Sequence, residues 1–494
     1  MTDTATRDAS EALARYEAVI GIEVHAQLRT ASKMFCGCST AYDGAPPNTH
    51  VCPVCLGLPG ALPTINQRAV EHVLTTGAAI EATAPPATRW DRKNYFYPDL
   101  PKGYQISQYD LPLASLGRLT FDTSEGPFTV AITRAHLEED TAKLVHATDE
   151  AGRRVSLVDF NRSGAPLMEI VTEPDIRTAE QARRYAEELQ LLLRSIGASD
   201  ADMERGQMRV EANVSLRPRG TEPYGTRVEV KNMNSFRAVE RAIDFEIERQ
   251  AAALDAGQPL LQETRGWSEE RGSTYRMRLK ETSDDYRYFP EPDLPPLHLK
   301  PEWLAEIRAR LPELPAARRR RYGDDLGLSA YDSSVLVADP DATYLFEATL
   351  ASDPGLEAKP VANWVIGEYL RLRNAGSEPP LIVPVELGAI VRVVTDGSIS
   401  RAQGRQVLEE HVATGGRATE IIESRGFEQI TDDSVLERAV EDAIAANPAA
   451  VADYRAGKSQ AVGFLVGQVM KLTRGQANAA IAQEAIRRHL DQAG

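Results

Sequence analysis

The sequence predicts an α+β protein in which a strand-rich first part is followed by helices. From residue 16 to about residue 298 the chain is rich in glycine, proline and β-branched runs, and several segments alternate apolar and polar residues. That period of two is typical of an antiparallel strand with one buried face. After the proline-rich stretch 290–297 the apolar residues recur at helical spacing instead.

Three segments of the first part carry the strand pattern with a polar face. Glu23 and His25 alternate with Ile22 and Val24, and residues 209–215 and 227–231 repeat the pattern. A solvated outer face of an antiparallel sheet would show the same alternation. The polar positions here are acidic or histidine, however, and the segment 136–140 adds more carboxylates. Such side chains suit a hard divalent cation.

The helical part predicts further divisions of the chain. Trp303, Leu304, Ile307 and Leu311 are spaced for one helix face, and a second break lies around residues 378–380. The segment beyond it reads as a run of short helices. We therefore expect four parts: a flexible arm and three domains, with the bounds 1–15, 16–298, 299–384 and 385–494.

Length and charge exclude some classes of protein. The chain has 494 residues, of which 42% are hydrophobic and 26% charged, and its formal net charge is -16. These values are typical of a globular protein of several domains, and the acidic balance argues against a surface that binds nucleic acid everywhere. No long apolar run and no signal peptide is seen, so we expect a cytoplasmic protein without a membrane partner. Local basic runs remain at Arg318–Arg321 and in the last 37 residues.

All the cysteines lie in one short segment, at Cys36, Cys38, Cys52 and Cys55. Two closely spaced pairs joined by a loop match the ligand spacing of a tetrahedral Cys₄ zinc site. Such a site is structural, because four thiolates leave no open position for water. Unligated thiols and disulfides are the alternatives, and a reducing cytoplasm disfavours disulfides. His50 is a reserve ligand.

The acidic clusters favour ATP-dependent phosphoryl transfer, since Mg²⁺ binds through a few carboxylates plus substrate phosphates. The sequence has neither a P-loop nor the motifs of a protein kinase. It also has no Gly-x-Ser-x-Gly elbow, and its cysteines have metal-ligand spacing. If ammonia is consumed, we expect another protein of the same complex to supply it.

Several motifs resemble one family closely. The run Leu157–Val171, with Asp159-Phe-Asn161-Arg162-Ser-Gly164, resembles the signature of the B subunit of the bacterial aspartyl/glutamyl-tRNA(Asn/Gln) amidotransferase. The tail segment Gly463–Gly475 resembles the YqeY-type domain of that family. Further family-like segments extend from about 16 to 298 and comprise Gly21–Leu28, Cys52–Gly60, Arg92–Ile106, His136–Asp140, Val228–Phe236 and Asp285–Asp293.

The resemblance implies a fold and a reaction. It implies a catalytic domain similar to glutamine synthetase, then a helical domain and a small tRNA-binding tail domain. It also implies that the side-chain carboxylate of Glu-tRNA(Gln) or Asp-tRNA(Asn) is activated by ATP with Mg²⁺. Ammonia from the glutaminase, which is the A subunit, then forms the amide, and the complex also contains the C subunit. Some members of the family carry the zinc element and others lack it.

The resemblance also assigns roles to residues. The magnesium and phosphate site is expected at Glu23, His25, Glu138, Glu139 and Glu211. Asp202 and Glu229 are further candidates that an ordinary surface role would also explain. Arg162 would orient phosphate, unless it forms a salt bridge with Asp159 or Glu169. Lys93, Lys102, Glu229 and Lys231 are the expected cofactor contacts, and Lys93 and Lys102 lie in the motif that borders the ammonia route. The expected tRNA contacts are Lys458, Lys471 and Arg474, with Arg318–Arg321 as further candidates.

Three other functions remain open. A stand-alone carboxylate–ammonia ligase resembling glutamine synthetase would need no tRNA, and its use for the long helical region is not obvious. A zinc-containing tRNA-binding module would need no carboxylate clusters. The archaeal relative specific for Glu-tRNA(Gln) usually carries an inserted domain, for which 494 residues leave little room. The choice between the two misacylated tRNAs is not readable from the sequence.

Overall fold

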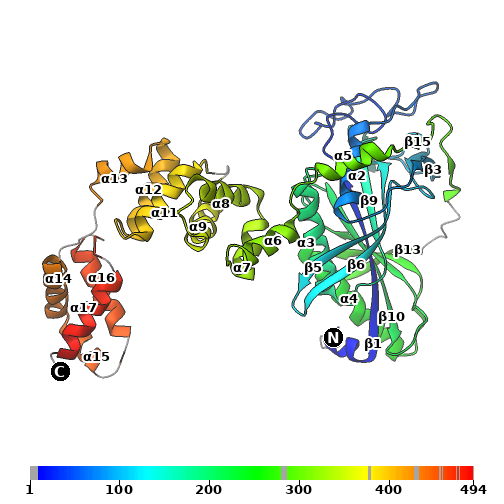
Figure 1. The fold of residues 1–494 in the computed structure, drawn as a ribbon. Coiled ribbons are helices and arrows are strands. Elements are labelled where there is room, and N and C mark those ends of the chain that lie inside the picture. Colours follow the sequence, from blue (N-terminus) through cyan, green and yellow to red (C-terminus); the bar gives the residue numbers. More distant parts are fainter. Residues whose placement is uncertain are drawn as a thin grey trace. The chain divides into compact units, whose positions relative to one another are not determined.

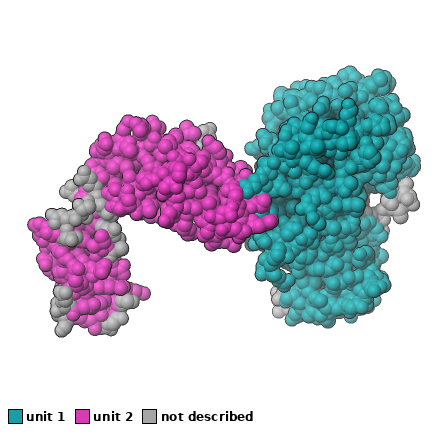
Figure 2. Space-filling model, in the orientation of Figure 1, with its two compact units in different colours: residues 1–316 teal, residues 317–494 magenta. Residues whose placement is uncertain are grey.

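The computed structural model describes residues 9–279, 286–376, 380–427, 433–455, 458, 460–473, 476–477 and 479–492. The chain divides into two compact units, residues 1–316 and residues 317–494, which we call unit 1 and unit 2 (Figure 2). Each unit is described by itself below. None of the described helices is both long enough and apolar enough to cross a bilayer.

Unit 1 is built on an eight-stranded sheet in the order β13-β12-β11-β10-β1-β9-β6-β5 (Figure 1). Only β11 and β12 run parallel, and the other neighbours are antiparallel. This sheet, followed by helices, confirms the predicted α+β class. The strands are β1 (Tyr16–Gln27), β5 (Ala114–Thr123), β6 (Gly126–Glu139), β9 (Pro166–Thr172), β10 (Met208–Pro218), β11 (Val228–Met233), β12 (Glu263–Ser268) and β13 (Ser273–Leu279).

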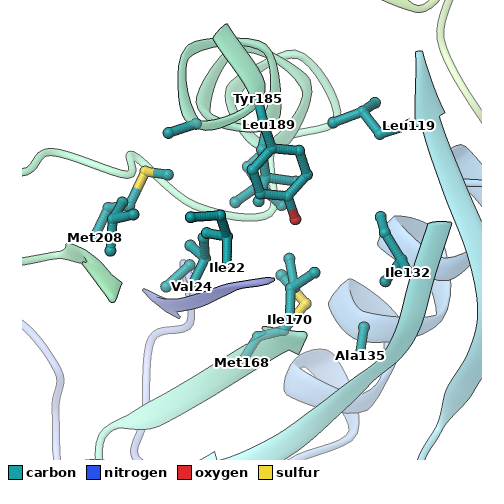
Figure 3. Close-up of a cluster of buried hydrophobic side chains, with 14 of the residues drawn as sticks. Ile22, Val24, Leu119, Ile132, Ala135, Met168, Ile170, Tyr185, Leu189 and Met208 are labelled. Atoms are coloured by element: carbon teal, nitrogen blue, oxygen red, sulfur yellow. The ribbon is translucent and has the colours of Figure 1, made fainter. Parts of the chain in front are cut away.

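One face of the sheet forms the core of unit 1. Helices α3 (Ala179–Ser195) and α4 (Phe236–Asp255) pack on it, and α2 (Gln67–Ala79) covers β5 and β6. Figure 3 shows Tyr185 and Leu189 of α3 above Ile22 and Val24 of β1. Each of these apolar side chains removes surface from water, worth about 1.5–3 kcal/mol for a fully buried one. The helices behind the sheet leave the opposite face to polar side chains.

Local signals in the sequence fix where these two helices start. Thr178 and Ser235 are their N-caps, and each side chain accepts a hydrogen bond from the backbone N–H three residues later. That bond satisfies one of the donors that the first turn of a helix leaves unpaired. Helix α3 therefore begins at a defined residue after β9, and α4 at a defined residue after β11.

Shorter strands stand beside the main sheet. They are β2 (Ala87–Thr88) with β15 (Leu297–His298), β7 (Lys143–Thr148) with β8 (Arg154–Asp159), and β4 (Tyr104–Ser107), β3 (Asp91–Asn94) and β14 (Phe289–Pro290). In the β14–β3–β4 sheet, Lys93 lies on β3, and Lys102 lies in the connection between β3 and β4.

The two ends of unit 1 differ from the expected division. Helix α1 (Ala9–Arg15) occupies the second half of the expected arm, and Arg15 forms an ion pair of 2.9 Å with Asp255 of α4. Residues 1–8 lie outside the described residues. At the other end, α5 (Pro301–Ala309) follows the expected change at 298 but packs against α2. Its apolar face joins the core of the sheet, so unit 1 extends to Ala316.

Unit 2 is helical throughout its described part. Helix α11 starts one residue before the expected boundary at 385, yet it packs against α8. The expected break at 378–380 falls largely on residues outside the described part. The helices are α6 (Pro315–Asp324, which begins in unit 1), α7 (Ala330–Val337), α8 (Pro340–Ser352), α9 (Ala358–Trp364), a π-helical turn (Val365–Tyr369), α10 (Leu370–Ala375), α11 (Pro384–Thr395), α12 (Arg401–Thr414), α13 (Ala418–Arg425), α14 (Asp433–Ala446), α15 (Pro448–Arg455), α16 (Gln460–Leu472) and α17 (Ala479–Gln492).

The last four helices, α14–α17, have a core of their own. Leu436 and Val440 of α14 pack with Leu465 and Val469 of α16, and Ile486 of α17 joins them. We call these four helices the tail bundle.

Candidate active site

The polar face of the main sheet is organised in rows that the strand register defines. His25 of β1 lies opposite Arg209 of β10 on one side and Glu169 of β9 on the other. Glu169 in turn lies opposite His136 of β6. Because side chains directly opposite each other on one face are close neighbours, these four ionisable groups form a continuous row across four strands.

A second row lies beside the first. Glu23 of β1 faces Glu211 of β10, and one step further along β10 Asn213 faces Glu229 of β11. Asn213 donates a hydrogen bond of 2.7 Å from Nδ2 to Oε1 of Glu23. The second row therefore gathers three carboxylates around one amide.

Both rows form the floor of a cleft of about 1360 Å³. Lys93 and the rings of Tyr95, Tyr286 and Tyr288 line the same cleft, together with Arg227. This volume exceeds the several hundred Å³ that are usual for a small-molecule site. Its floor is acidic, and lysine and arginine side chains are interspersed along its lining.

Two groups of side chains in the cleft could each hold a cation. The first group is His25, Glu138 and Glu169, each of which offers a ligand atom within 4.8 Å of the others. The His25 Nε2 atom is 3.5 Å from Oε1 of Glu138 and 3.4 Å from Oε2 of Glu169. Burial disfavours a charged His25, but the hydrogen bond to Glu169 and the nearby carboxylates outweigh it and raise its pKa to about 9. A proton on His25 thus supplies positive charge that a bound cation could supply instead.

The second group that could hold a cation is Glu23, Glu211 and Glu229, with ligand atoms within 4.8 Å of one another. Burial, and then the charges of Glu169, Glu211 and Glu229, raise the pKa of Glu23. Lys231 Nζ lies 2.7 Å from Oε2 of Glu211 and 3.7 Å from Oε1 of Glu229, so it offsets part of this charge. Oxygen donors gathered in this way suit Mg²⁺, which takes few carboxylates and leaves positions for substrate oxygens.

Two of the expected cofactor contacts, Lys93 and Lys102, lie in different places. Lys93 lines the cleft with its Nζ 5.2 Å from the centre of the Tyr286 ring. Burial lowers its pKa, but the charge of Glu138 and other neighbours outweighs burial and raises the pKa above its ordinary value. Lys102 lies outside the residues that line the cleft and pairs with Oε1 of Glu139 at 2.6 Å.

The structure separates Glu139 from the other expected magnesium ligands. Successive side chains of a strand point to opposite faces, so Glu138 and Glu139 cannot share a site. Glu139 lines a second cavity of about 120 Å³ with Lys102, Tyr104 and Cys55. It accepts a hydrogen bond of 2.9 Å from the backbone N–H of Ile106. Glu139 is therefore one half of a buried ion pair with Lys102 and does not line the cleft.

Arg162 has backbone partners and does not line the cleft. Its Nε and Nη2 donate hydrogen bonds of 2.9 Å each to the carbonyls of Thr141 and Ala142. The side chain that reaches the cleft is Arg209, whose Nη2 is 3.0 Å from Oδ1 of Asp140. Asp140 is buried, and the neighbouring guanidinium groups of Arg209 and Arg162 outweigh burial and lower its pKa. It therefore acts as a fixed anchor for Arg209.

The four cysteines come together as the spacing predicts. Cys36, Cys38, Cys52 and Cys55 offer sulfur atoms within 4.8 Å of one another, which is a possible metal site. A hydrogen bond with Cys36 is the main cause that lowers the pKa of Cys55 to about 4. The thiolate is the form that binds metal. His50 is outside this group, and its Nδ1 is 3.4 Å from the carbonyl of Ser39.

The sequence reasoning missed Glu169, His136 and Arg209 as members of the site. A signal for Glu169 was present, since it alternates with Met168 and Ile170 as Glu23 does with Ile22 and Val24. Burial lowers the pKa of His136 to about 4, which leaves a neutral ring beside Glu169. Asp202 lies away from the cleft and accepts hydrogen bonds from the backbone of Glu204 and Arg205.

The expected tRNA contacts lie in unit 2. Lys471 is exposed on α16, and the exposed Lys458 forms an ion pair of 2.9 Å with Asp453. Arg474 lies outside the described residues. Within the basic run, Arg318 and Arg321 both pair with Glu347, which reduces the positive charge that this run presents.

The main sheet is largely antiparallel, with helices on one face and, on the other, a cleft that contains two groups of side chains able to hold cations. This combination defines an α+β protein with a candidate cation-binding cleft on its sheet. Two family models match the chain: the GatB/GatE catalytic domain over residues 18–305 and the GatB domain over residues 344–490. The chain belongs to the family of aspartyl/glutamyl-tRNA(Asn/Gln) amidotransferase B subunits.

Similar proteins agree over the full length. The B subunit of this amidotransferase from Moorella thermoacetica is 52% identical over 96% of this chain and 100% of its own length. Those from Thermomicrobium roseum and Dehalococcoides mccartyi are 50% and 48% identical, over 97% of this chain in both cases and 99% and 100% of their own lengths. These relatives are named as one component of an enzyme with several.

Proposed function

We propose that this protein is the component of a tRNA-dependent amidotransferase that activates the misacylated amino acid. The substrate is Glu-tRNA(Gln), Asp-tRNA(Asn) or both. ATP phosphorylates the side-chain carboxylate, and ammonia from the glutaminase, the A subunit, replaces the phosphate to give the amide. The C subunit completes the complex, and the reaction takes place in the cytoplasm. The observation that carries the proposal is the pair of carboxylate groups on the floor of one large cleft.

The chemistry explains why two groups are needed. A carboxylate is a poor electrophile, so it must acquire a leaving group before ammonia can attack it. Transfer of a phosphoryl group brings several negative charges together, and Mg²⁺ held by His25, Glu138 and Glu169 and by Glu23, Glu211 and Glu229 would neutralise them. The side chains of both groups suit this ion because most of their donors are carboxylate oxygens.

Cationic side chains of the cleft complete the proposed site. Lys93 and Lys231, which line the cleft, would contact the cofactor phosphates, the role that the resemblance gives them. Arg209 takes the phosphate-orienting role expected of Arg162, because its guanidinium lies in the cleft and Asp140 fixes one side of it. A guanidinium held in this way can present its remaining N–H groups to a phosphate as a fork.

The remaining expected residues receive roles outside the cleft. Lys102 and Glu139 lie in the smaller cavity and border the route by which ammonia enters. The four cysteines hold a structural Zn²⁺, for which four sulfur donors are the usual set. The bounds expected from the sequence are kept as the proposal: residues 16–298 form the catalytic domain, and residues 299–384 form a helical domain whose first helix, α5, packs on the core of unit 1. Residues 385–494 form the tail domain, which binds tRNA through Lys458, Lys471 and Arg474.

The test is reconstitution with the A and C subunits and both misacylated tRNAs. We expect formation of Gln-tRNA(Gln), Asn-tRNA(Asn) or both that requires ATP and glutamine. Glu138→Gln and Glu211→Gln each change one carboxylate group and should lower this activity by about 100-fold or more. Glu125→Gln, an exposed carboxylate of the β5–β6 turn, is the matched control and should leave it unchanged.

Other outcomes would identify another function. Amide formation on free glutamate without tRNA would point to a stand-alone ligase. Binding of tRNA that is unaffected by Glu138→Gln and Glu211→Gln, with no ATP turnover in the complex, would point to a zinc-containing binding module. Either result would overturn the proposal.

A further inference from the structure

A buried lysine beside the cysteine cluster has no part in the proposed reaction. Lys33 follows β1, and its side chain is 0% exposed. Lysine is almost never fully buried without a partner, because its ammonium group loses its hydration. Within the described part of the chain no ion pair joins Lys33 to a carboxylate. Its Nζ contacts Sγ of Cys55 at 3.6 Å and the carbonyl of Phe160 at 3.3 Å.

The backbone on both sides of Lys33 is fixed by the same elements. The Lys33 N–H donates a hydrogen bond of 2.9 Å to the carbonyl of Cys38, and the Met34 N–H donates one of 2.7 Å to the carbonyl of Gly164. Asn66 donates from Nδ2 to the carbonyl of Lys33 at 3.2 Å. Lys33 is thus held between the first cysteine pair and the loop that follows β8.

The buried stem of the Lys33 side chain lies beside Gly164 and Cys55. Gly164 has a φ of +82°, and a Cβ atom there would lie 3.7 Å from Cδ of Lys33 and 3.5 Å from Cβ of Cys55. Both distances are ordinary van der Waals contacts, so the positive φ, rather than a lack of space, is what favours glycine at this position. The ammonium group at the end of this stem is placed by its contacts with the sulfur of Cys55 and the carbonyl of Phe160.

The negative charge of a metal-loaded cysteine cluster would make a neighbouring ammonium group favourable. Four thiolates around one divalent cation leave two negative charges in a site that is partly or fully removed from water. We propose that Lys33 is the built-in counter-charge of the cysteine site: its ammonium group donates a charge-assisted hydrogen bond to Cys55 and so slows the loss of the metal. This proposal rests on the proposed Zn²⁺ site and extends it to a residue that binds no metal itself. Groups around a metal site that hold its ligands commonly tune its affinity.

Three variants separate the charge of Lys33 from its hydrogen bond. Lys33→Met keeps the apolar stem and removes both, Lys33→Gln keeps an N–H donor without the charge, and Lys33→Arg keeps both. Lys143→Met, at an exposed lysine of β7, is the matched control. The full-length reduced protein in its complex is loaded with zinc, and the metal content and the release of Zn²⁺ to a chromogenic chelator are measured.

We expect Zn²⁺ release to be about 10-fold or more faster in Lys33→Met and intermediate in Lys33→Gln. Lys33→Arg and Lys143→Met should release it at the unaltered rate. If Lys33→Met does not fold, the comparison of Lys33→Gln with Lys33→Arg gives the same test. A second readout is the sulfur-to-metal charge-transfer band of the Co²⁺-loaded protein, which should shift in Lys33→Gln because Cys55 loses a charged donor.

The contrary results are distinct. Equal release rates and an unshifted band in Lys33→Gln and Lys33→Met would overturn the role of Lys33 while leaving the zinc site intact. Unaltered protein that takes up no zinc would overturn the metal site, and with it the role of Lys33. Neither result would bear on the proposed role of the carboxylate cleft, which is tested separately by the tRNA-dependent activity.

Discussion

At the scale of single residues, Glu23 combines a proposed function with a cost to stability. Its burial, and then the charges of Glu169, Glu211 and Glu229, raise its pKa above the ordinary value of 4.5. A raised carboxyl pKa contributes stability that is fully present below the unfolded value and is lost as the pH rises through the folded value. As the pH rises toward neutral, therefore, Glu23 contributes less stability to the metal-free fold, and a cation beside it would offset the cost of its charge.

Glu23→Gln should consequently stabilise the metal-free protein while it lowers activity. We expect a gain of about 1 kcal/mol at pH 7.5, or about 2 °C in Tm, that becomes smaller toward pH 5. Thermal unfolding in the presence of a chelator, at both pH values, measures it. Added Mg²⁺ should raise the Tm of the unaltered protein more than that of the variant. Equal Tm values for both proteins at pH 7.5 without metal would contradict the repulsion.

Arg209 and Arg162 contact the same buried Asp140 but should respond differently to the same change. Arg209→Lys keeps the charge beside Asp140 and removes the fork that we propose for phosphate, so kcat should fall by about 100-fold with little change in Tm. Arg162→Lys loses the hydrogen bonds to Thr141 and Ala142, at a cost of about 1–2 kcal/mol, and should keep most of kcat. Steady-state kinetics and thermal unfolding of both variants measure the contrast. A loss of kcat in Arg162→Lys alone would reverse the assignment.

The sequence predicts single residues of the cleft where strand alternation is decisive. It placed Glu23, His25 and Glu211 on polar faces, and all three line the cleft. The same rule separates Glu138 from Glu139, since neighbours along a strand face opposite sides, so the expectation that both belong to one magnesium site is wrong. The position of Arg162 was not predictable in this way, because its partners are backbone carbonyls that only the folded loop brings near it.

At the scale of elements, the loop that carries the second cysteine pair also packs on Lys102. Gly57 has a φ of +66°, and a Cβ atom there would overlap the side chain of Lys102. Gly60 has a φ of +80° but open space around its Cα. Alanine at either position therefore suffers the same backbone strain, of about 1–2 kcal/mol, while only alanine at position 57 would displace Lys102 from Glu139.

This pair of glycines tests whether Lys102 and Glu139 serve the ammonia route. In the reconstituted complex, Gly57→Ala should lower the amide formed per glutamine hydrolysed by about 10-fold, because Lys102 no longer sits against Glu139. Gly60→Ala should keep that ratio and show the loss of stability alone. The ratio follows from parallel assays of glutamate release and of amidated tRNA. Equal ratios in both variants would mean that the contact between Gly57 and Lys102 is only structural.

The order of the strands could not be predicted, although the strands themselves could. β1 lies between β9 and β10, which are separated from it in the chain by more than 100 residues, and no local pattern selects these partners. Register between such strands depends on which apolar faces meet under α3 and α4. The two carboxylate groups are a product of that pairing, which is why the sequence predicted their members better than their grouping.

At the scale of the whole molecule, cores rather than changes of composition define the parts. The change to helices at 298 was visible in the sequence, yet α5 belongs to the core of unit 1. Trp303, Leu304 and Leu311 pack against that core. The helical spacing that predicts a new domain after residue 298 is therefore the spacing that places the apolar face of α5 on unit 1. Spacing alone predicts that a helix has an apolar face and not which element covers it.

The tail bundle has a separate core, and this permits a test of what it does for the reaction. Its apolar residues, among them Leu436, Val440, Leu465 and Ile486, pack with one another. A chain that ends at Phe427 should therefore keep the fold of unit 1 and its Tm, since none of the residues in that core belongs to the sheet.

If the bundle binds tRNA as proposed, the KM of this shortened chain for misacylated tRNA should rise by about 10-fold or more while kcat changes little, because phosphate contacts position the substrate without taking part in the chemistry. Lys471→Glu in the full chain is the milder version: it should raise this KM several-fold at low salt and less at high salt, as expected for the loss of one phosphate contact. An unchanged KM in the shortened chain would assign tRNA binding to the rest of the complex, and a collapse of kcat with unchanged KM would mean that the bundle acts on the cleft instead.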